Sequence, residues 1–350
     1  MSKKLLQSPF PPSSDGPLRD IVHSFIHYPT ILVADDLNLF GILDEEPLSR
    51  PEIAKKLALD GRPTEAMLGM LVSLSLLDCH EGRYYLTPIA NTYLLPRSEY
   101  YWGPVFEMNR PLLMGAEPLK KAMLENKTGS FQGKLDSEDS LIDEWDAGEP
   151  SDEEARGFTE CMHALFWGLA QSVAALVDFG SVTRLLDMGG GSGCFSIAIA
   201  RQNPEMKCTV VDLKPVCNVT KTFIEKLDAE EQVDVQPGDM FSPDWPSGYD
   251  GVFFSNVFHD WWEERCRLMA RNSFAALPSG GRIFLFEMLL DDSRNGGLSA
   301  TGFSMYMVYL MRGKQYSAEE LRSFLQDEGF VDFTVQSVTD HFSLVSARKP

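Results

Sequence analysis

A single histidine stands in the stretch 255–262, SNVFHDWW, directly after an apolar run that has the character of a buried strand. An imidazole has an ordinary pKa of about 6.5, so His259 can accept or donate a proton at neutral pH. Asp260 and Trp261 follow it and are expected to shape the wall of any site that it serves. A histidine and two tryptophans can also close the end of a hydrophobic core, and the stretch read alone favours that structural interpretation.

A glycine-rich turn lies at 189–193, in LLDMGGGSGC, between a predicted strand and a predicted helix. Gly189, Gly191 and Gly193 permit positive φ and let a ligand approach the backbone closely. Dinucleotide-binding folds have a similar turn, but Ser196 replaces the third glycine of their GxGxxG spacing. Asp187 suits the ammonium group of a methionine moiety better than a pyrophosphate. The turn therefore favours S-adenosylmethionine, with a nicotinamide cofactor as the alternative.

Two further acidic residues end the next two predicted strands. Asp212, in TVVDL, can accept hydrogen bonds from both ribose hydroxyls of either nucleotide cofactor. Asp239 and Met240, in PGDMF, offer a carboxylate for an exocyclic amine and a thioether for the face of an apolar ring. Together these residues predict an adenosine site.

The elements that must position these residues follow an alternating strand and helix pattern from Val182 onward. Apolar strands alternating with helices predict an α/β fold with a Rossmann-like, mostly parallel sheet covered on both faces. We expect this catalytic domain to span 179–350, preceded by connecting helices and an acidic loop over 101–178. Residues 1–15, rich in Ser and Pro, are expected to form a flexible tail.

Residues 16–100 predict a second, mostly helical domain. An apolar helix over 67–77 runs into two short strands joined at Glu81 and Gly82, which is the pattern of a winged helix. A winged helix suggests DNA binding, but no cluster of Lys and Arg falls on the segment that would be the recognition helix. Dimerisation is the favoured role, and a DNA-binding regulator is the alternative.

The composition limits the partners that the chain can have. Its 31 Lys and Arg against 51 Asp and Glu give a formal net charge of -20, which repels nucleic acid and anionic membrane surfaces. No apolar run could span a bilayer and the N-terminus has no apolar signal core, so we expect a cytoplasmic protein. The six cysteines form no CxxC motif and lie beside no spaced histidines, so we expect neither a disulfide framework nor a metal site.

Taken in order, the glycine turn, TVVDL, GDMF and FHDWW resemble the small-molecule O-methyltransferases typified by caffeic acid, acetylserotonin and hydroxyneurosporene methyltransferases. The resemblance extends from PEIAKKL near the N-terminus to the C-terminal strand. It implies S-adenosylmethionine as the methyl donor, a small-molecule acceptor of secondary metabolism, and a homodimer formed through the N-terminal domain. With the turn residues, the candidate donor-contacting residues are Asp187, Gly189, Gly191, Asp212, Leu213, Asp239, Met240, Phe241, Phe166 and Ser255, which stands where the plant enzymes have a lysine.

The same resemblance assigns the base to His259 and the glutamate that orients it to Glu287, in FLFEMLLDD. The family's second glutamate is replaced by Gln315, in the run Gly-Lys-Gln-Tyr-Ser, whose Ser317 predicts a capping box with Glu320. The candidate acceptor-contacting residues are Met162, Trp167, Asp260 and Met305.

Methyl transfer to a hydroxyl oxygen of an aromatic or polyketide-like metabolite is the favoured function. The apolar run FSMYMVYLM suggests a flat acceptor, although it would equally suit a buried helix. One alternative is a C- or N-methyltransferase, or a relative that binds the donor without transferring its methyl group. A nicotinamide oxidoreductase or a winged-helix regulator is a more distant one.

Overall fold

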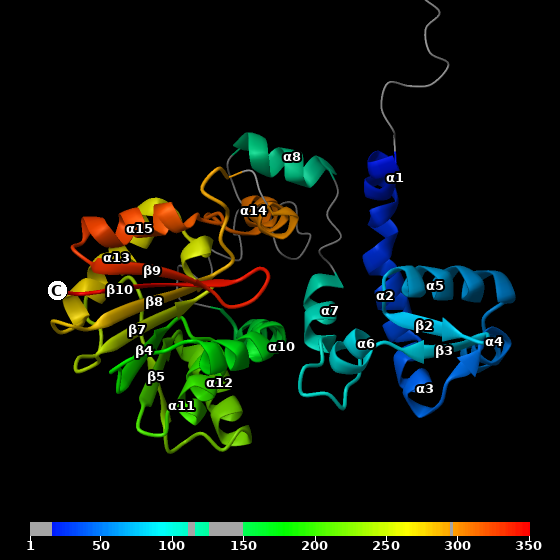
Figure 1. Ribbon diagram of the computed structural model, residues 1–350, viewed down its shortest axis with the longest axis horizontal. Coiled ribbons are helices and arrows are strands. Elements are labelled where there is room, and N and C mark those ends of the chain that lie inside the picture. The colour runs from blue at the N-terminus through cyan, green and yellow to red at the C-terminus, as the bar shows by residue number, and fades with distance from the viewer. Residues whose placement is uncertain (1–15, 111–115, 126–149, 295–296) are drawn as a thin grey trace, which may run out of the picture. The chain divides into compact units, whose positions relative to one another are not determined.

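The computed structural model describes residues 16–110, 116–125, 150–294 and 297–350 (Figure 1). The chain forms two compact units, residues 1–103 and 104–350, which are described separately below. The predicted tail over 1–15 and most of the predicted acidic loop lie outside the described residues.

The first unit combines helices with a small antiparallel sheet of order β1-β3-β2. The turn between β2 and β3 has Glu81 and Gly82 at positive φ. The predicted helix followed by two strands is therefore confirmed, although the helix ends at Ser73 rather than at 77. The elements are α1 (Gly16–His23), η1 (Ser24–Ile26), α2 (His27–Asp36), α3 (Leu39–Glu45), β1 (Leu48–Ser49), α4 (Arg50–Leu57), α5 (Gly61–Ser73), β2 (Leu77–His80), β3 (Arg83–Leu86) and α6 (Pro88–Tyr93).

The second unit is built on a seven-stranded sheet of order β6-β5-β4-β7-β8-β10-β9. Strands β6 to β8 in that order pair in parallel, whereas β10 pairs antiparallel with β8 and β9. The predicted mostly parallel sheet is confirmed. The strands are β4 (Arg184–Met188), β5 (Lys207–Asp212), β6 (Val233–Pro237), β7 (Gly251–Ser255), β8 (Arg282–Glu287), β9 (Val331–Ser337) and β10 (Ser343–Arg348).

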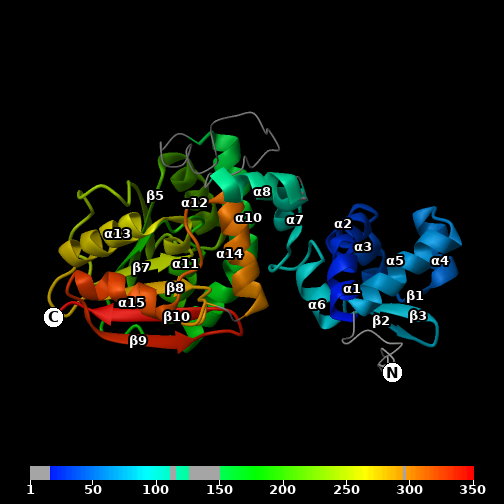
Figure 2. The ribbon, with the colours of Figure 1, turned by 90° about the horizontal axis from the view of Figure 1, so that it is seen from above.

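Helices cover both faces of this sheet (Figures 1 and 2). Phe253 of β7 packs on Phe195 of α11, with ring centroids 5.5 Å apart, and α10 and α12 lie on the same side. Its neighbour Phe254 enters the core formed with α13 and α15 on the opposite side. Burial on both faces explains why the strands are continuously apolar. The helices are α7 (Gly103–Asn109), α8 (Ala116–Glu125), α10 (Asp152–Leu176), α11 (Cys194–Gln202), α12 (Lys214–Lys226), η3 (Phe258–Asp260), α13 (Glu263–Ala276), α14 (Leu298–Leu310) and α15 (Ala318–Asp327).

Capping boxes in the sequence fix where two of these helices begin. Ser151 and Glu154 form one at the start of α10, and Ser317 and Glu320 form the predicted one at the start of α15. In each, the serine hydroxyl accepts from the glutamate backbone N–H, and the glutamate carboxylate accepts from the serine backbone N–H. The second box also fixes the loop that carries Gln315.

The order of the strands reverses at β4, which has β5 on one side and β7 on the other. In open α/β sheets, ligands bind outside the carboxyl ends of the strands at such a switch point. The loops after β4, β5 and β7 carry the glycine turn, Leu213 and His259, respectively. The topology therefore places the candidate residues at one edge of the sheet.

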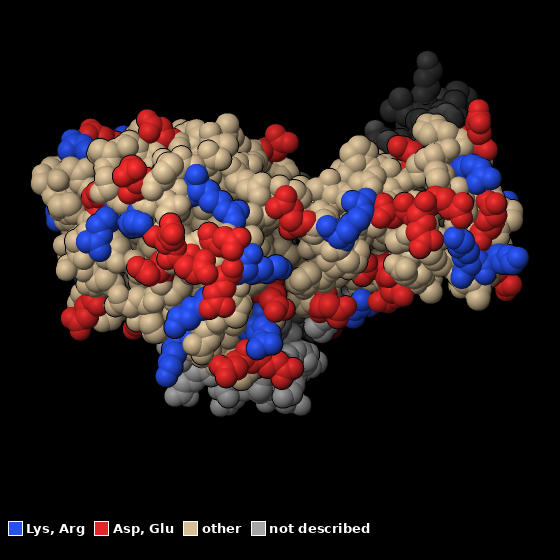
Figure 3. All heavy atoms as spheres, turned by 90° about the horizontal axis from the view of Figure 1, so that it is seen from below, with Lys and Arg blue, Asp and Glu red and all other residues tan. Residues whose placement is uncertain are grey.

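The surface shows mixed charge on the face in Figure 3, where acidic and basic side chains are interspersed over each unit. The described part of that face therefore has no extended patch of Lys and Arg of the kind that binds nucleic acid, in keeping with the net charge of -20. Among the described residues, no helix is long and apolar enough to cross a membrane.

Candidate active site

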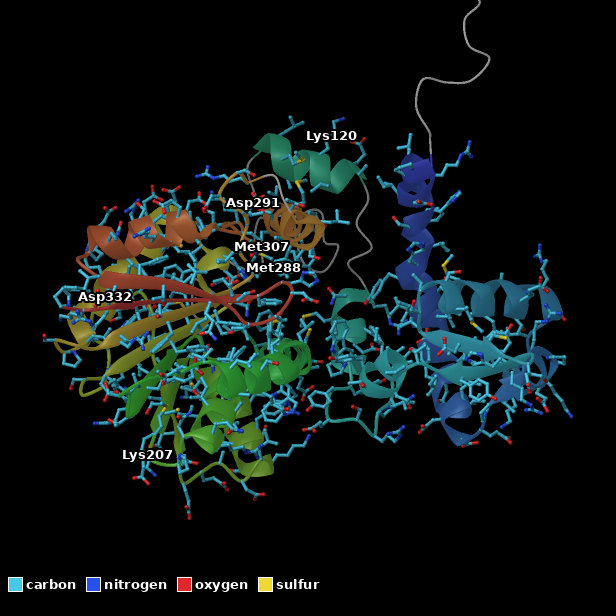
Figure 4. The ribbon with its side chains drawn as sticks, viewed as in Figure 1. Lys120, Lys207, Met288, Asp291, Met307 and Asp332 are labelled. Carbon is cyan, nitrogen blue, oxygen red and sulfur yellow. The ribbon has the colours of Figure 1, made fainter. Side chains whose placement is uncertain are left out.

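A cavity of about 630 Å³ lies at the switch point, within the second unit. A cavity of this size can enclose most of a drug-sized ligand. Met288, which follows β8, and Met307, on α14, both line it and are labelled in Figure 4. Of the sequence-predicted residues, the cavity wall includes Gly189, Gly191, Asp212, Met240, Ser255, Phe166, Met162, His259 and Asp260.

The glycine turn forms one wall of the cavity with its backbone. Gly189, Gly191 and Gly193 all have positive φ, as predicted from their residue type. A Cβ added to Gly189 would lie 3.1 Å from a methyl group of Val257 and 3.2 Å from Met240 Cε. A Cβ added to Gly191 would meet no described atom within 4 Å, so the backbone there faces open space. A ligand can therefore approach this turn closely.

Asp212 stands beside the turn at the end of β5 and is almost fully buried. Its carboxylate accepts from Gly191 N at 2.9 Å and from Leu213 N at 2.7 Å. Burial raises the pKa of Asp212 to about 6, although these two backbone N–H groups favour the charged form. Leu213 thus contributes to the site by orienting Asp212, and its own side chain is not part of the cavity wall.

Asp187 lies beneath the turn instead of in the cavity wall. It is buried, and its Oδ2 accepts from the hydroxyl of Ser196 on α11 at 2.7 Å. A Cβ on Gly190 would approach the Asp187 carboxyl carbon to 2.7 Å. Burial raises the pKa of Asp187 to about 7. Its position therefore suits support of the turn and of α11.

His259 lies on η3, just beyond β7, between two carboxylates. Its Nε2 is 3.2 Å from Asp260 Oδ1, and its Nδ1 is 3.1 Å from Glu287 Oε2, although the Nδ1 contact is not aligned as a hydrogen bond. The other carboxylate oxygen of Glu287 accepts from Val257 N at 3.1 Å and from Phe258 N at 2.9 Å. Glu287 thereby fixes the backbone that leads to His259 and places a carboxylate oxygen beside the ring.

The two carboxylates determine the charge of His259. Burial by itself lowers the pKa of the imidazole, but the charges of Asp260 and Glu287 outweigh it and raise the pKa to about 10. With both carboxylates in place, His259 carries a proton at neutral pH. Its ability to accept another group's proton therefore depends on the position of Asp260, the more exposed of the two.

The remaining walls of the cavity are mostly apolar. α14 contributes Phe303, whose ring centroid is 5.5 Å from that of His259, and Tyr306, whose hydroxyl donates to Asn109 Oδ1 of α7 at 3.1 Å. α10 contributes Phe158, Met162, Leu165 and Phe166. These side chains form an apolar pocket of aromatic and methionine side chains next to His259, as FSMYMVYLM suggested in part.

Several sequence-predicted residues do not line this cavity. Trp167 is buried against His163, and Met305 is 41% exposed on the outer side of α14. Helical periodicity explains both positions, because Trp167 directly follows the wall residue Phe166 and Met305 directly precedes the wall residue Tyr306. Asp239, Phe241 and Gln315 also lie outside the wall; Asp239 accepts from Phe241 N at 2.8 Å, and Gln315 is fully buried.

Other residues of the cavity wall were not predicted from the sequence. Ser192 was passed over within the glycine turn, and Thr159 lies one turn before Met162 on α10. Met108 and Asn109 come from α7, far from the motifs in the sequence. Only the helical spacing of Thr159, Met162 and Phe166 offered a signal, since residues at such intervals share a face.

Family models identify the two parts of the chain. A model described as an O-methyltransferase domain matches residues 121–331, which is more than half of the chain. The chain belongs to the O-methyltransferase family. A second model, described as an O-methyltransferase dimerisation domain, matches residues 20–96 of the same chain.

Individual relatives of this O-methyltransferase cover nearly its whole length. It is 31% identical over 322 residues to 3-hydroxy-5-methyl-1-naphthoate 3-O-methyltransferase of Streptomyces sahachiroi, covering 91% of both chains. It is 26% identical to L-tyrosine C(3)-methyltransferase of Streptomyces lavendulae, covering 87% of this chain and 84% of that one. The fold is that of human N-acetylserotonin methyltransferase in complex with SAM, with a TM-score of 0.83 at 24% identity over 98% of this chain and 99% of that one.

Proposed function

We propose that the protein transfers a methyl group from S-adenosylmethionine to a hydroxyl oxygen of a flat aromatic or polyketide-like metabolite. The observation that carries this proposal is one cavity that joins the glycine turn and Asp212 to a histidine held between two carboxylates. The relative from Streptomyces sahachiroi, whose name gives a hydroxynaphthoate as its substrate, supports an aromatic acceptor.

The donor end of the cavity fits an adenosyl ligand. Asp212 presents an almost fully buried carboxylate at the end of β5, and Gly191 presents open backbone. The thioether of Met240 offers a polarisable surface for the adenine ring. When bound, the donor supplies an electrophilic methyl group, so the chain itself must orient the acceptor oxygen and receive its proton.

His259 is proposed to receive that proton. The acceptor hydroxyl takes the place of Asp260 Oδ1 at Nε2, and Asp260, whose side chain is 23% exposed, turns toward solvent. Without the nearby Asp260 charge, the pKa of His259 falls and the imidazole releases its proton to solvent. The neutral Nε2 then accepts the hydroxyl proton while the oxygen attacks the methyl group. Glu287 keeps the ring in place throughout.

The pH dependence of kcat/KM tests this role of Asp260. Because His259 must lose a proton whose pKa is about 10, kcat/KM should rise with pH through the neutral range. Asp260→Asn removes one of the two charges that raise this pKa, so its rising limb should move to lower pH by about one to three units. The pH profiles of the parent and of Asp260→Asn are measured with the same acceptor, so that titration of the acceptor affects both profiles equally. If the rising limbs of the two profiles coincide, Asp260 does not have the proposed role.

A panel of acceptors tests the function as a whole. Formation of S-adenosylhomocysteine should depend on flat phenols such as naphthols and hydroxyanthraquinones, and it should be absent with matched compounds that lack the ring hydroxyl. Methylation of a ring carbon also needs an electron-donating hydroxyl on the ring, so the product decides between the two reactions. A methyl ether supports transfer to oxygen, whereas a ring methyl group would favour C-methylation. That second candidate has specific support from the C(3)-methyltransferase among the relatives.

We further propose that the helix-and-hairpin fold of the first unit serves homodimer formation and does not bind DNA. Residues 20–96 match a dimerisation domain, and α1 and η1 carry several exposed apolar side chains. Leu18, Ile21 and Phe25 are 64%, 68% and 73% exposed, respectively. We call these exposed side chains of α1 and η1 the apolar patch. Because the segment matches a dimerisation domain, a second copy of the chain is the partner expected to cover this patch.

Charge placed on this patch should dissociate the dimer. Ile21→Glu combined with Phe25→Glu would bury two like charges at the same interface, so the variant should sediment as a monomer at micromolar concentration where the parent is a dimer. Val335→Glu adds a charge at an exposed apolar position on β9 and should leave the dimer intact. Identical sedimentation of the double variant and the parent would place the interface elsewhere.

A further inference from the structure

A second histidine contacts the glycine turn from outside the central sheet. His163, on α10, lies with its Nδ1 3.0 Å from the hydroxyl oxygen of Ser192. Ser192 belongs to the turn, lines the cavity and is only 2% exposed. Because so little water reaches this hydroxyl, a protein partner is needed to satisfy it.

The surroundings of His163 fix its ring and its charge. The ring stacks on Phe223 of α12 with centroids 4.1 Å apart and on Trp167 with centroids 5.4 Å apart. Burial, together with the nearby charge of Lys226, lowers the pKa of His163 to about 4. The imidazole is therefore neutral at physiological pH, and it can share one directed hydrogen bond with Ser192 without placing a charge beside the turn.

The other bonds that shape the turn come from elements of the nucleotide-binding half of the sheet. Gly189 N donates to Val211 O at 2.8 Å, and Gly191 is held by Asp212 and by the hydroxyl of Thr220. By contrast, α10 also carries Met162, a candidate acceptor-contacting residue, in the cavity wall. The bond between His163 and Ser192 therefore joins the donor-facing turn to the helix that lines the acceptor side.

We propose that His163 is a positioning residue, which holds Ser192 and thereby sets the affinity of the glycine turn for S-adenosylmethionine. The inference rests on the donor assignment made under the proposed function. Because the proposed role depends on the hydrogen bond of His163 and not on its ring, loss of the ring stack with Phe223 and Trp167 should leave donor affinity nearly unchanged.

Two substitutions at position 163 separate the hydrogen bond from the ring stack. His163→Phe keeps an aromatic ring between Trp167 and Phe223 but removes the nitrogen, whereas His163→Asn keeps a polar atom near the place of Nδ1 but removes the ring. Calorimetric titration with S-adenosylmethionine should give a Kd about tenfold higher for His163→Phe and a Kd within about threefold of the parent for His163→Asn. Thermal unfolding should show the opposite order, with His163→Asn the less stable variant.

Ser192→Ala completes a double-mutant cycle. Ser192→Ala and His163→Phe should each weaken donor binding, and the double variant should bind no more weakly than the weaker single variant, because both remove the same bond. Three results would overturn the proposal. The first is a double variant whose loss of donor affinity is the product of the two single losses. The others are parental donor affinity in His163→Phe, or an equal loss of donor affinity in His163→Phe and His163→Asn. Failure of the parent itself to bind S-adenosylmethionine would instead contradict the donor assignment.

Discussion

Replacing His259 with alanine is expected to lower turnover by roughly a hundredfold to ten-thousandfold, the usual contribution of a general base. A phenol has an ordinary pKa near 10, so its oxygen attacks effectively only as it loses its proton. In this site His259 lines the cavity, and Oε2 of Glu287 lies 3.1 Å from Nδ1 of its ring. Alanine removes the proton acceptor but leaves the methyl donor's site untouched.

The measurement is single-turnover methyl transfer at saturating donor and acceptor. Calorimetry with S-adenosylmethionine serves as the control, because Asp212 and the glycine turn do not contact His259 in any described hydrogen bond and should retain their affinity. Turnover within a fewfold of the parent, on the true acceptor, would mean that proximity alone drives the transfer and that His259 is not the base.

Asp212→Ala should weaken the binding of S-adenosylmethionine by about tenfold to a hundredfold. The variant loses a charged acceptor for the ribose hydroxyls, and a hydrogen bond to a charged group contributes roughly 1.5 to 3 kcal/mol. It also releases Gly191 N and Leu213 N, which the carboxylate now accepts from. The fold should survive, because β5 remains paired on both sides.

Two matched variants sharpen this test. Asp212→Asn keeps one carbonyl oxygen and should bind the donor with an intermediate affinity. Asp234→Ala removes an exposed carboxylate from the neighbouring strand β6 and should bind like the parent. Unchanged donor affinity in Asp212→Ala, measured by calorimetry, would remove Asp212 from the ribose site.

Much of the fold was predictable because its strands are short and apolar and its turns carry specific residue types. The glycines at positive φ, the strands ending in Asp212 and Glu287, and the capping box at Ser317 all follow from local sequence. At these positions the local backbone conformation requires a particular residue type, such as glycine at positive φ or serine in a capping box. The structure there can therefore be predicted without knowing the rest of the fold.

The cavity wall was less predictable, because tertiary packing decides which face of a helix meets the cavity. Met305 was predicted and is exposed, whereas its neighbours Tyr306 and Met307 line the wall. Trp167 was predicted, yet it packs on His163. An apolar residue on a helix fits a core and a ligand pocket equally well, so its type alone does not separate the two.

Charge coupling was also beyond the sequence. The stretch FHDWW shows Asp260 next to His259, but neighbours in sequence need not have side chains in contact. The structure brings both Asp260 and Glu287 within 3.2 Å of the imidazole, which raises its pKa to about 10 instead of leaving it near 6.5. The sequence therefore predicted a base at His259, but it did not predict the proton that such a base must first release.

The position of the transferred methyl group tests the central proposal most directly. The protein is incubated with S-adenosylmethionine carrying a ¹³C-labelled methyl group and with a phenol that it turns over, and the product is examined by carbon NMR. We predict that the label appears as a methoxy carbon bonded to the former hydroxyl oxygen, and that its yield falls with His259→Ala. Label found on a ring carbon or on nitrogen would contradict methyl transfer to oxygen at His259.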